Sequence, residues 1–211
     1  MIIGIPKESW RDERRVALTP AGVYALVKAG HQVIVQAEAG AGCGFTTAAY
    51  DEAGARIAFS AAEIFGRADL VVKVMPPALE ECQWLPAEKF LFSWLQLGVA
   101  NPKALTALRE RRITAVGYEL IEAQEGSLPV LTAMSEIAGG LLPQIAGRYL
   151  ETTHGGRGIA LGGIAGIPAA NIVIVGAGIA GGYAARAFLG AGANVLVLDA
   201  DLKRLRKLEI L

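Results

Sequence analysis

The stretch Ile172-Val173-Ile174-Val175-Gly176-Ala177-Gly178-Ile179-Ala180-Gly181 decides the fold, because a β-branched run leads directly into a G-x-G-x-x-G pattern. Gly176 permits a tight turn out of the predicted strand, and Gly178 lets backbone approach a pyrophosphate. Gly181 lets the following helix pack closely against the strand. The free N–H groups and positive dipole end of that helix would face the phosphates. The stretch therefore predicts a dinucleotide site.

The residues that follow complete the pattern. An alanine-rich helical segment runs from Tyr183 to Ala191, and a second apolar run, Val195 to Leu198, ends in Asp199. Asp199 lies 21 positions beyond Gly178, close to the offset of about 20 residues expected for an acid that accepts from ribose hydroxyls. An acid there also repels a 2′-phosphate, which favours NAD over NADP. The alternative is a glycine-rich structural turn, which the combination of strand, helix, second strand and acid disfavours.

Charge and hydropathy exclude several classes of protein. The 211 residues include 20 basic and 20 acidic side chains, so the formal net charge is zero, which argues against a nucleic-acid partner or an anionic membrane surface. The start, Met1 to Ile5, has neither a basic leader nor a cleavage site, so we expect no signal peptide. The most apolar window, Ile167 to Ala185, is broken by four glycines and predicts strand, turn and helix rather than a membrane span.

The cysteines and histidines bear on the cellular compartment and on metal binding. Cys43 and Cys82 lack any metal-binding spacing, and two isolated cysteines suit a reducing cytoplasm, although two could pair. His31 and His154 are too few and too far apart for a metal cluster. We therefore expect a cytoplasmic protein without a metal site.

Residues 1 to about 125 alternate short apolar runs with helical segments, which predicts an α/β fold with a doubly wound parallel sheet. This region has no glycine turn of its own, which suggests a substrate-binding lobe. The predicted strands are Ile2–Ile5, His31–Val35, Arg56–Phe59, Leu70–Val74, Phe90–Leu97 and Ile113–Val116, and helices are predicted to follow Thr19, Thr46 or Thr47, Ser60 and Asn101.

Three segments follow from this pattern. Residues 1–127 are the N-terminal substrate-side lobe, 128–166 are a long helix and a glycine-rich connector, and 167–211 are the first part of a Rossmann NAD-binding lobe. The long helix is predicted from Thr132 to Leu150, capped by Thr132 or Ser135 and kinked or divided at Pro143. A dinucleotide lobe has about six strands and this one has two, so we expect a C-terminally truncated, split or partly covered version of a longer protein.

Two basic residues stand out in the first lobe. Lys73 lies in the apolar run Leu70–Val74, where a lysine is costly unless paired. It is expected either to snorkel at a strand end or to line a ligand cleft at the carboxyl end of a parallel strand. Arg15 precedes apolar Val16-Ala17-Leu18. It is expected either to lie in a solvated loop or to turn inward and bind a carboxylate.

Five segments together resemble the family of alanine dehydrogenases and NAD(P) transhydrogenase alpha subunits. They are GIPKESWRDERRVALTPAGV (4–23), LVVKVMPP (70–77), LPVLTAMSEIAGG (128–140), GGRGIALGGIAGIP (155–168) and IVIVGAGIAG (172–181). The third and fourth place the chain on the alanine dehydrogenase side of the family. The resemblance implies oxidative deamination of L-alanine to pyruvate and ammonia, with NAD as cofactor, by a homo-oligomer.

The resemblance also implies roles for single residues. Arg15 would hold the substrate carboxylate, and Lys73 would be the active-site lysine that hydrogen-bonds the keto acid. The remaining positions would contact NAD: Met134 and Ser135 in the predicted long helix, Gly176, Gly178, Gly181 and Asp199 in the nucleotide motif, and Arg204 near the adenosine end, where a solvated helix face is an equal alternative.

One position departs from the family. Gln96 stands where alanine dehydrogenases carry the histidine that acts as acid and base, and an amide cannot exchange a proton near neutral pH. Two alternative functions therefore stay open. One is an NAD-binding transhydrogenase subunit, and the other is a non-catalytic remnant that acts as a binding or oligomerisation module. We expect the isolated chain to bind NAD weakly and to form no NADH from alanine.

Overall fold

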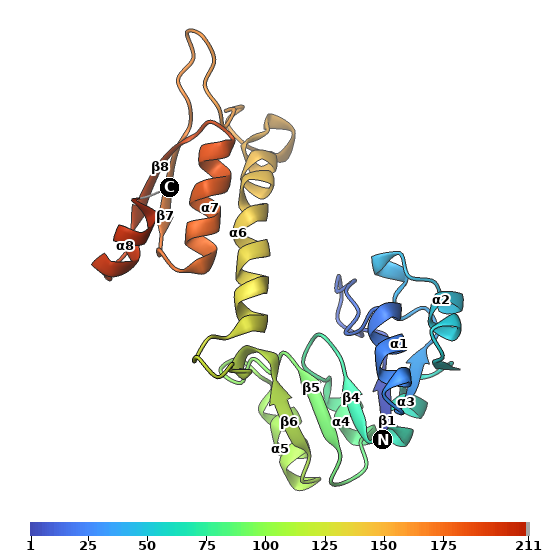
Figure 1. Ribbon diagram of the computed structural model, residues 1–211. Coiled ribbons are helices and arrows are strands. Elements are labelled where there is room, and N and C mark those ends of the chain that lie inside the picture. Colours follow the sequence, from blue (N-terminus) through green and yellow to red (C-terminus); the bar gives the residue numbers. More distant parts are fainter. Residues whose placement is uncertain (210–211) are drawn as a thin grey trace. The chain divides into compact units, whose positions relative to one another are not determined.

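The computed structural model describes residues 1–209, which form two compact units divided between Ile121 and Glu122 (Figure 1). The first unit is a six-stranded sheet with the strand order β3-β2-β1-β4-β5-β6, and every neighbouring pair is parallel. The predicted α/β class with a doubly wound parallel sheet is confirmed.

Strands and helices alternate along this unit. The strands are β1 Ile2–Ile5, β2 Gln32–Gln36, β3 Arg56–Ala58, β4 Leu70–Val72, β5 Phe90–Ser93 and β6 Thr114–Gly117. The helices are α1 Pro20–Lys28, α2 Thr47–Glu52, α3 Ala61–Arg67, α4 Leu79–Trp84 and α5 Pro102–Glu110, with short 3-10 turns η1 Ala41–Cys43 and η2 Tyr118–Leu120.

Four of these helices begin where the sequence predicts, because a polar side chain accepts a hydrogen bond from an N–H group of the first turn. Thr19 caps α1 and Asn101 caps α5, and each is followed by a proline at the first helical position. Thr46 caps α2 and Ser60 caps α3.

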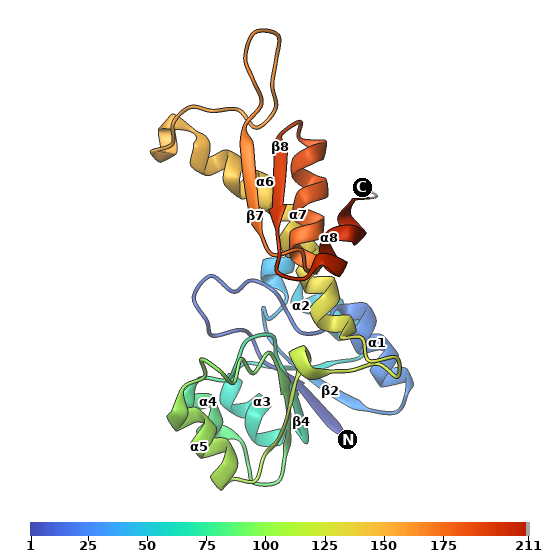
Figure 2. The same ribbon diagram turned by 90° about the vertical axis from the view of Figure 1, so that its left-hand side faces the viewer.

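Two apolar layers cover the two faces of the sheet. On one face, Val23 of α1 and Tyr50 of α2 pack with Ile5, Val33 and Val35. The other face carries α3, α4 and α5, which contribute a second cluster that includes Phe65, Cys82, Leu91 and Leu108. Figure 2 shows α1 and these three helices on opposite sides of the sheet. Neither apolar layer includes the polar side chains that follow the carboxyl ends of the strands.

The second unit is smaller. Its elements are α6 Pro129–Leu150, η3 Thr152–His154, β7 Asn171–Val175, α7 Ile179–Gly190, β8 Asn194–Leu198 and α8 Leu202–Leu208. Strands β7 and β8 pair in parallel, and α7 lies alongside α6 (Figure 1). Buried Gly139 of α6 makes this approach possible, because a Cβ there would stand 2.8 Å from the Cβ of Tyr183.

One face of the β7–β8 sheet is apolar and exposed. Val173, Val175, Leu196 and Leu198 are 47–85% exposed, whereas the alternate residues Ile172, Ile174 and Val195 pack toward Ala184 and Phe188. Burial therefore alternates along both strands, yet the residues on both faces are apolar, as in a sheet that is covered on both sides.

The long helix α6 differs from its prediction. It begins at Pro129, so the prediction that Thr132 or Ser135 caps it is wrong. Leu128 precedes the first turn without a side-chain cap, and Pro129 occupies the first position, where a missing N–H costs nothing. The helix also runs unbroken through Pro143, so the alternative of a divided helix is wrong.

Three predicted strands are shorter in the structure, β3 by one residue, and one helix was missed. Strand β4 ends at Val72 instead of Val74, and β5 ends at Ser93 instead of Leu97. Helix α4 has no side-chain N-cap that a sequence pattern could reveal, since Ala78 precedes it. The carboxylate of Glu81 instead reaches back to accept from the Ala78 N–H at 2.8 Å.

No helix within residues 1–209 is long and apolar enough to cross a membrane. Both cysteines are free thiols; Cys43 is exposed and Cys82 is buried. Burial raises the pKa of the Cys82 thiol to about 11.

We expect Gly4→Ala to destabilise the first unit. A Cβ at this position in β1 would stand 2.7 Å from Cγ2 of Ile64 and 2.8 Å from Cβ of Ala68, and overpacking of this kind costs about 1–3 kcal/mol. Gly66→Ala is the matched control, because a Cβ at that helical site meets nothing within 4 Å and is expected to stabilise by about 0.5–1 kcal/mol. Urea unfolding measures both, and equal effects would contradict the packing described for Gly4.

Candidate functional site

The sheet of the first unit places two charged residues side by side. Its strand order reverses direction between β1 and β4, and open α/β sheets bind ligands beyond the carboxyl ends of the strands at such a switch point. Glu8 follows β1 at this point, and Lys73 directly follows β4. Lys73 lies at the carboxyl end of a parallel strand, as predicted, but its fully buried side chain does not line an open cleft there.

Lys73 is completely buried in an ionic cluster. Its ammonium lies 2.6 Å from Oε2 of Glu81 and 3.8 Å from Oε2 of Glu8, and both carboxylate side chains are at most 4% exposed. Ser9 donates to the other oxygen of Glu81 at 2.9 Å. The expectation of a snorkelling lysine is therefore wrong, because the ammonium pairs internally rather than reaching solvent.

Glu8 holds two loops together. Its carboxylate accepts from the Val74 N–H at 2.6 Å and from the Met75 N–H at 3.3 Å. Burial raises the pKa of Glu8, opposed by the nearby Lys73 ammonium and by these two N–H donors. Neither Glu8 nor Glu81 was predicted as a site residue, although an acid just past a strand end was a signal for Glu8.

Arg15 lines a cavity of about 240 Å³ together with Glu8, Glu13, Arg14 and Glu38; we call it the Arg15 cavity. Glu13 binds one edge of the guanidinium, accepting from Nε at 2.9 Å and from Nη2 at 2.6 Å. This pairing lowers the pKa of Glu13 and raises that of Arg15. The Arg15 side chain is 46% exposed and the Glu13 side chain only 10%, so a largely buried carboxylate anchors a partly exposed guanidinium.

Gln96 lies elsewhere in the unit. It lines an apolar cavity of about 550 Å³ with Trp10, Pro76 and Leu95, among others, and not the Arg15 cavity. Its backbone has a φ of 47°, and its N–H donates to Oε1 of Glu119 at 2.7 Å. The structure therefore brings Arg15 and Glu8 together, encloses Lys73 behind them, and leaves Gln96 on a separate wall.

The glycine motif of the second unit has the geometry that dinucleotide binding requires. Gly176 has a φ of 108°, a conformation open to glycine. A Cβ on Gly181 would collide with the Gly176 carbonyl oxygen, whereas a Cβ on Gly178 would meet nothing within 4 Å. Gly178 therefore leaves open space at the N-terminus of α7, which has no side-chain cap. Its free N–H groups fit a phosphate.

Asp199 follows β8 and is anchored by backbone. One carboxylate oxygen accepts from the Ala177 N–H at 2.6 Å, and the other accepts from the Asp201 N–H at 2.7 Å. These donors lower the pKa of Asp199, so the group is an anion at neutral pH. The acid thus holds the glycine turn in place.

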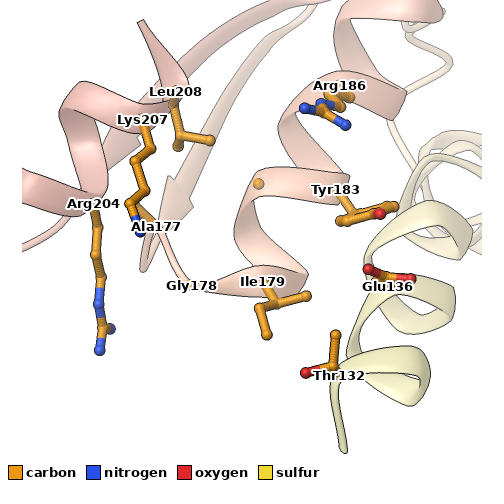
Figure 3. Close-up of a pocket in the computed structure, with 11 residues that line it drawn as sticks. Thr132, Glu136, Ala177, Gly178, Ile179, Tyr183, Arg186, Arg204, Lys207 and Leu208 are labelled. Atoms are coloured by element: carbon orange, nitrogen blue, oxygen red, sulfur yellow. The ribbon is translucent and has the colours of Figure 1, made fainter. Parts of the chain in front are cut away.

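A cavity of about 570 Å³ extends from Gly178 and Ile179 to basic residues of α7 and α8. Figure 3 shows Arg204 and Lys207 on one wall and Thr132 and Glu136 of α6 on the other. Arg204, for which a contact near the adenosine end is predicted, lines this cavity. Met134 and Ser135 do not line this cavity, because Thr132 and Glu136 supply that wall of α6.

The chain matches the alanine dehydrogenase/PNT N-terminal domain over residues 4–138 and the C-terminal domain of the same family over residues 143–211. The chain belongs to the alanine dehydrogenase/PNT family, as the sequence predicts.

Individual relatives agree with this assignment. An alanine dehydrogenase of Methanococcus maripaludis and one of Geobacillus stearothermophilus are each 43% identical over 209 residues. Each match covers 99% of this chain and 56% of the relative. The chain therefore spans little more than half the length of these relatives.

Solved structures give the same result. An L-alanine dehydrogenase superposes with a TM-score of 0.91 at 41% identity, covering all of this chain and 58% of the other. A transhydrogenase from Sinorhizobium meliloti superposes with a TM-score of 0.84 at 28% identity, covering 62% of that chain. Within residues 1–209, no group of three or more His, Cys, Asp or Glu side chains could hold a metal ion.

We expect Lys73→Met to destabilise the chain by about 3–5 kcal/mol, because it leaves the carboxylates of Glu8 and Glu81 buried without their cation. Lys89→Met removes an ammonium that also pairs at 2.7 Å, with Asp69, but both of these side chains are 30–39% exposed. That control is expected to cost at most about 1 kcal/mol. Denaturant unfolding of the two variants at neutral pH measures the difference, and similar losses would argue against a buried ionic cluster.

Proposed function

We propose that this chain forms the substrate-binding lobe and the first part of the NAD-binding lobe of an alanine dehydrogenase. The reaction is the oxidative deamination of L-alanine to pyruvate and ammonia. The observation that carries this proposal is the Arg15 cavity beyond the carboxyl ends of β1 and β2, in a chain 43% identical to alanine dehydrogenases.

Arg15 would bind the substrate carboxylate. Glu13 occupies the Nε–Nη2 edge of the guanidinium, and Nη1 makes none of the described hydrogen bonds. A guanidinium held in this way presents its donors to an anionic oxygen at little entropic cost. Lys73 would act on the substrate through the electrostatic field of its ammonium and not by direct contact, since the side chain is fully enclosed.

The second unit would hold NAD. The α7 N-terminus would bind the pyrophosphate, Asp199 would accept from the ribose, and Arg204 would stand near the adenosine end. The bound nicotinamide supplies the hydride acceptor. Both oxygens of Asp199 accept a backbone hydrogen bond, which fixes the orientation of the carboxylate and supports this role.

Two alternatives have specific support. The structural likeness to a transhydrogenase supports an NAD-binding subunit of that kind. Gln96, which cannot titrate, supports a non-catalytic module. Pyruvate binding by the purified chain, measured by titration calorimetry, would separate the dehydrogenase lobe from both, since neither alternative needs a site for the keto acid.

We further propose that the protein is cytoplasmic and assembles as a homo-oligomer. Two free thiols suit a reducing compartment. Exposed apolar side chains along α6, including Ile137, Leu141 and Ile145, would be covered in an assembly.

We expect Gly178→Ala to weaken NAD binding by tenfold or more without loss of stability. A Cβ there meets no protein atom but fills the open space in front of α7. Gly190→Ala, at the opposite end of the same helix, also meets nothing within 4 Å and is expected to bind as the unmodified chain does. Ligand-observed NMR at millimolar NAD detects even weak binding, and equal affinities for the two variants would speak against this phosphate site.

We expect Arg15→Ala to weaken pyruvate binding about tenfold or more, because a charge-assisted hydrogen bond contributes about 1.5–3 kcal/mol. Arg14→Ala removes the same charge from the same cavity and is expected to have a much smaller effect, since Arg14 has no matching carboxylate clamp in the described hydrogen bonds. Titration calorimetry with pyruvate compares them. Equal losses of pyruvate affinity in the two variants would mean that Arg15 contributes only its charge and no specific hydrogen bond.

A further inference from the structure

The ionic cluster of the first unit has more negative than positive groups. One ammonium, Lys73, serves two carboxylates, and it lies much closer to Glu81 at 2.6 Å than to Glu8 at 3.8 Å. Glu81 and Lys73 therefore neutralise one another as a close pair. The carboxylate of Glu8 is the surplus charge, and a surplus buried charge is relieved by taking up a proton.

Glu8 is also the cluster member that faces the Arg15 cavity. Its carboxylate side chain is only 2% exposed, and Glu8 lines the cavity with Arg14 and Gly42, which lie in the loops after β1 and β2. A carboxylate placed by two backbone N–H groups beside an arginine would lie next to any small acid that the guanidinium binds. Glu8 therefore combines a fixed position and a surplus charge with a place in the cavity wall.

Several charged groups act on Glu8 from the elements around it. Burial and the carboxylate of Glu81 raise its pKa, while the Lys73 ammonium lowers it. Tyr118 lies close enough for the carboxylate of Glu8 to raise the phenol pKa, and Arg15 is close enough for Glu8 to raise the arginine pKa. The other charged residues of the cavity wall are Lys7, Glu13, Arg14 and Glu38.

We propose that Glu8 is the residue that exchanges protons with the substrate in the Arg15 cavity. This inference rests on the proposed function. Oxidative deamination, with the dinucleotide as hydride acceptor, passes through an iminium acid to which water adds. The water oxygen bonds to the iminium carbon, the C=N π pair moves to nitrogen, and the displaced water proton bonds to the Glu8 carboxylate. Glu8 then gives this proton to the amine nitrogen and takes the hydroxyl proton as the C–N bond breaks, releasing ammonia and forming the keto group.

This assignment explains how the reaction could proceed with an amide at position 96. Gln96 carries no titratable proton and lines a different cavity from Arg15. Efficient acid–base catalysis needs a group whose pKa is shifted toward the working pH. Among the residues described in the wall of the Arg15 cavity, Glu8 is the carboxyl whose pKa is raised.

The first experiment needs no ligand and no substitution. ¹³C NMR of the side-chain carboxyl carbons, with assigned resonances, follows the titration of every glutamate in the unmodified chain. We expect the midpoint of Glu8 to lie above that of Glu13, whose pKa is lowered by Arg15, and above the ordinary glutamate range. A midpoint of Glu8 within or below the ordinary range would overturn the proposal.

The second experiment measures protons taken up when pyruvate binds. Calorimetric titration in two buffers of different ionisation enthalpy gives this number, and the anionic ligand should drive a proton onto Glu8. We expect the uptake to be lost in Glu8→Gln and kept in Glu38→Gln, which neutralises an exposed carboxylate of the same cavity. If Glu8→Gln binds pyruvate with unchanged proton uptake, the proposed role of Glu8 is wrong while the proposed function stands. Absence of pyruvate binding to the unmodified chain would instead reject the proposed function, and the catalytic role of Glu8 with it.

Discussion

The buried ammonium of Lys73 is the constraint on which the first unit depends. A lysine without exposed surface requires charged partners, and those partners come from separate parts of the chain. Glu81 arrives from α4 and Glu8 from the loop after β1, and each also accepts from backbone N–H groups of the segment between Val74 and Ala78. The ion cluster thus ties three connections together beyond the carboxyl ends of β1 and β4. The Arg15 cavity lies against this fixed set of loops.

The two units would bind anionic ligands through different groups, although both are built on parallel sheets. The first has the strand order of a dinucleotide-binding domain, but β1 leads into Pro6 and Glu8 rather than into a glycine turn. Its anion-binding group is a side chain, Arg15, which is held by Glu13. The second unit offers main-chain N–H groups at the start of α7, and the carboxylate of Asp199 holds that turn in place. In both cases an internal acid orients the group that would meet the ligand.

Local patterns were sufficient to predict most of the fold and part of the candidate sites. Side-chain caps and apolar runs indicated α1, α3, α5 and most strands, because these signals lie within a few residues. The start of α6 was missed because Pro129 replaces a polar cap. The roles of Glu8 and Glu81 in the first site were missed for a different reason: their partner is 65 and 8 positions away, respectively. Only folding brings them together.

The contrast between the two cysteines gives this chain a convenient chemical property. The thiol of Cys82 is enclosed and its pKa is raised to about 11, so it is a poor nucleophile at neutral pH. Cys43 is exposed and directly follows Gly42, a residue of the Arg15 cavity wall. A maleimide or a spin label would therefore attach selectively beside that cavity in the unaltered sequence. A reporter placed there would register ligands and loop movements without any engineered residue.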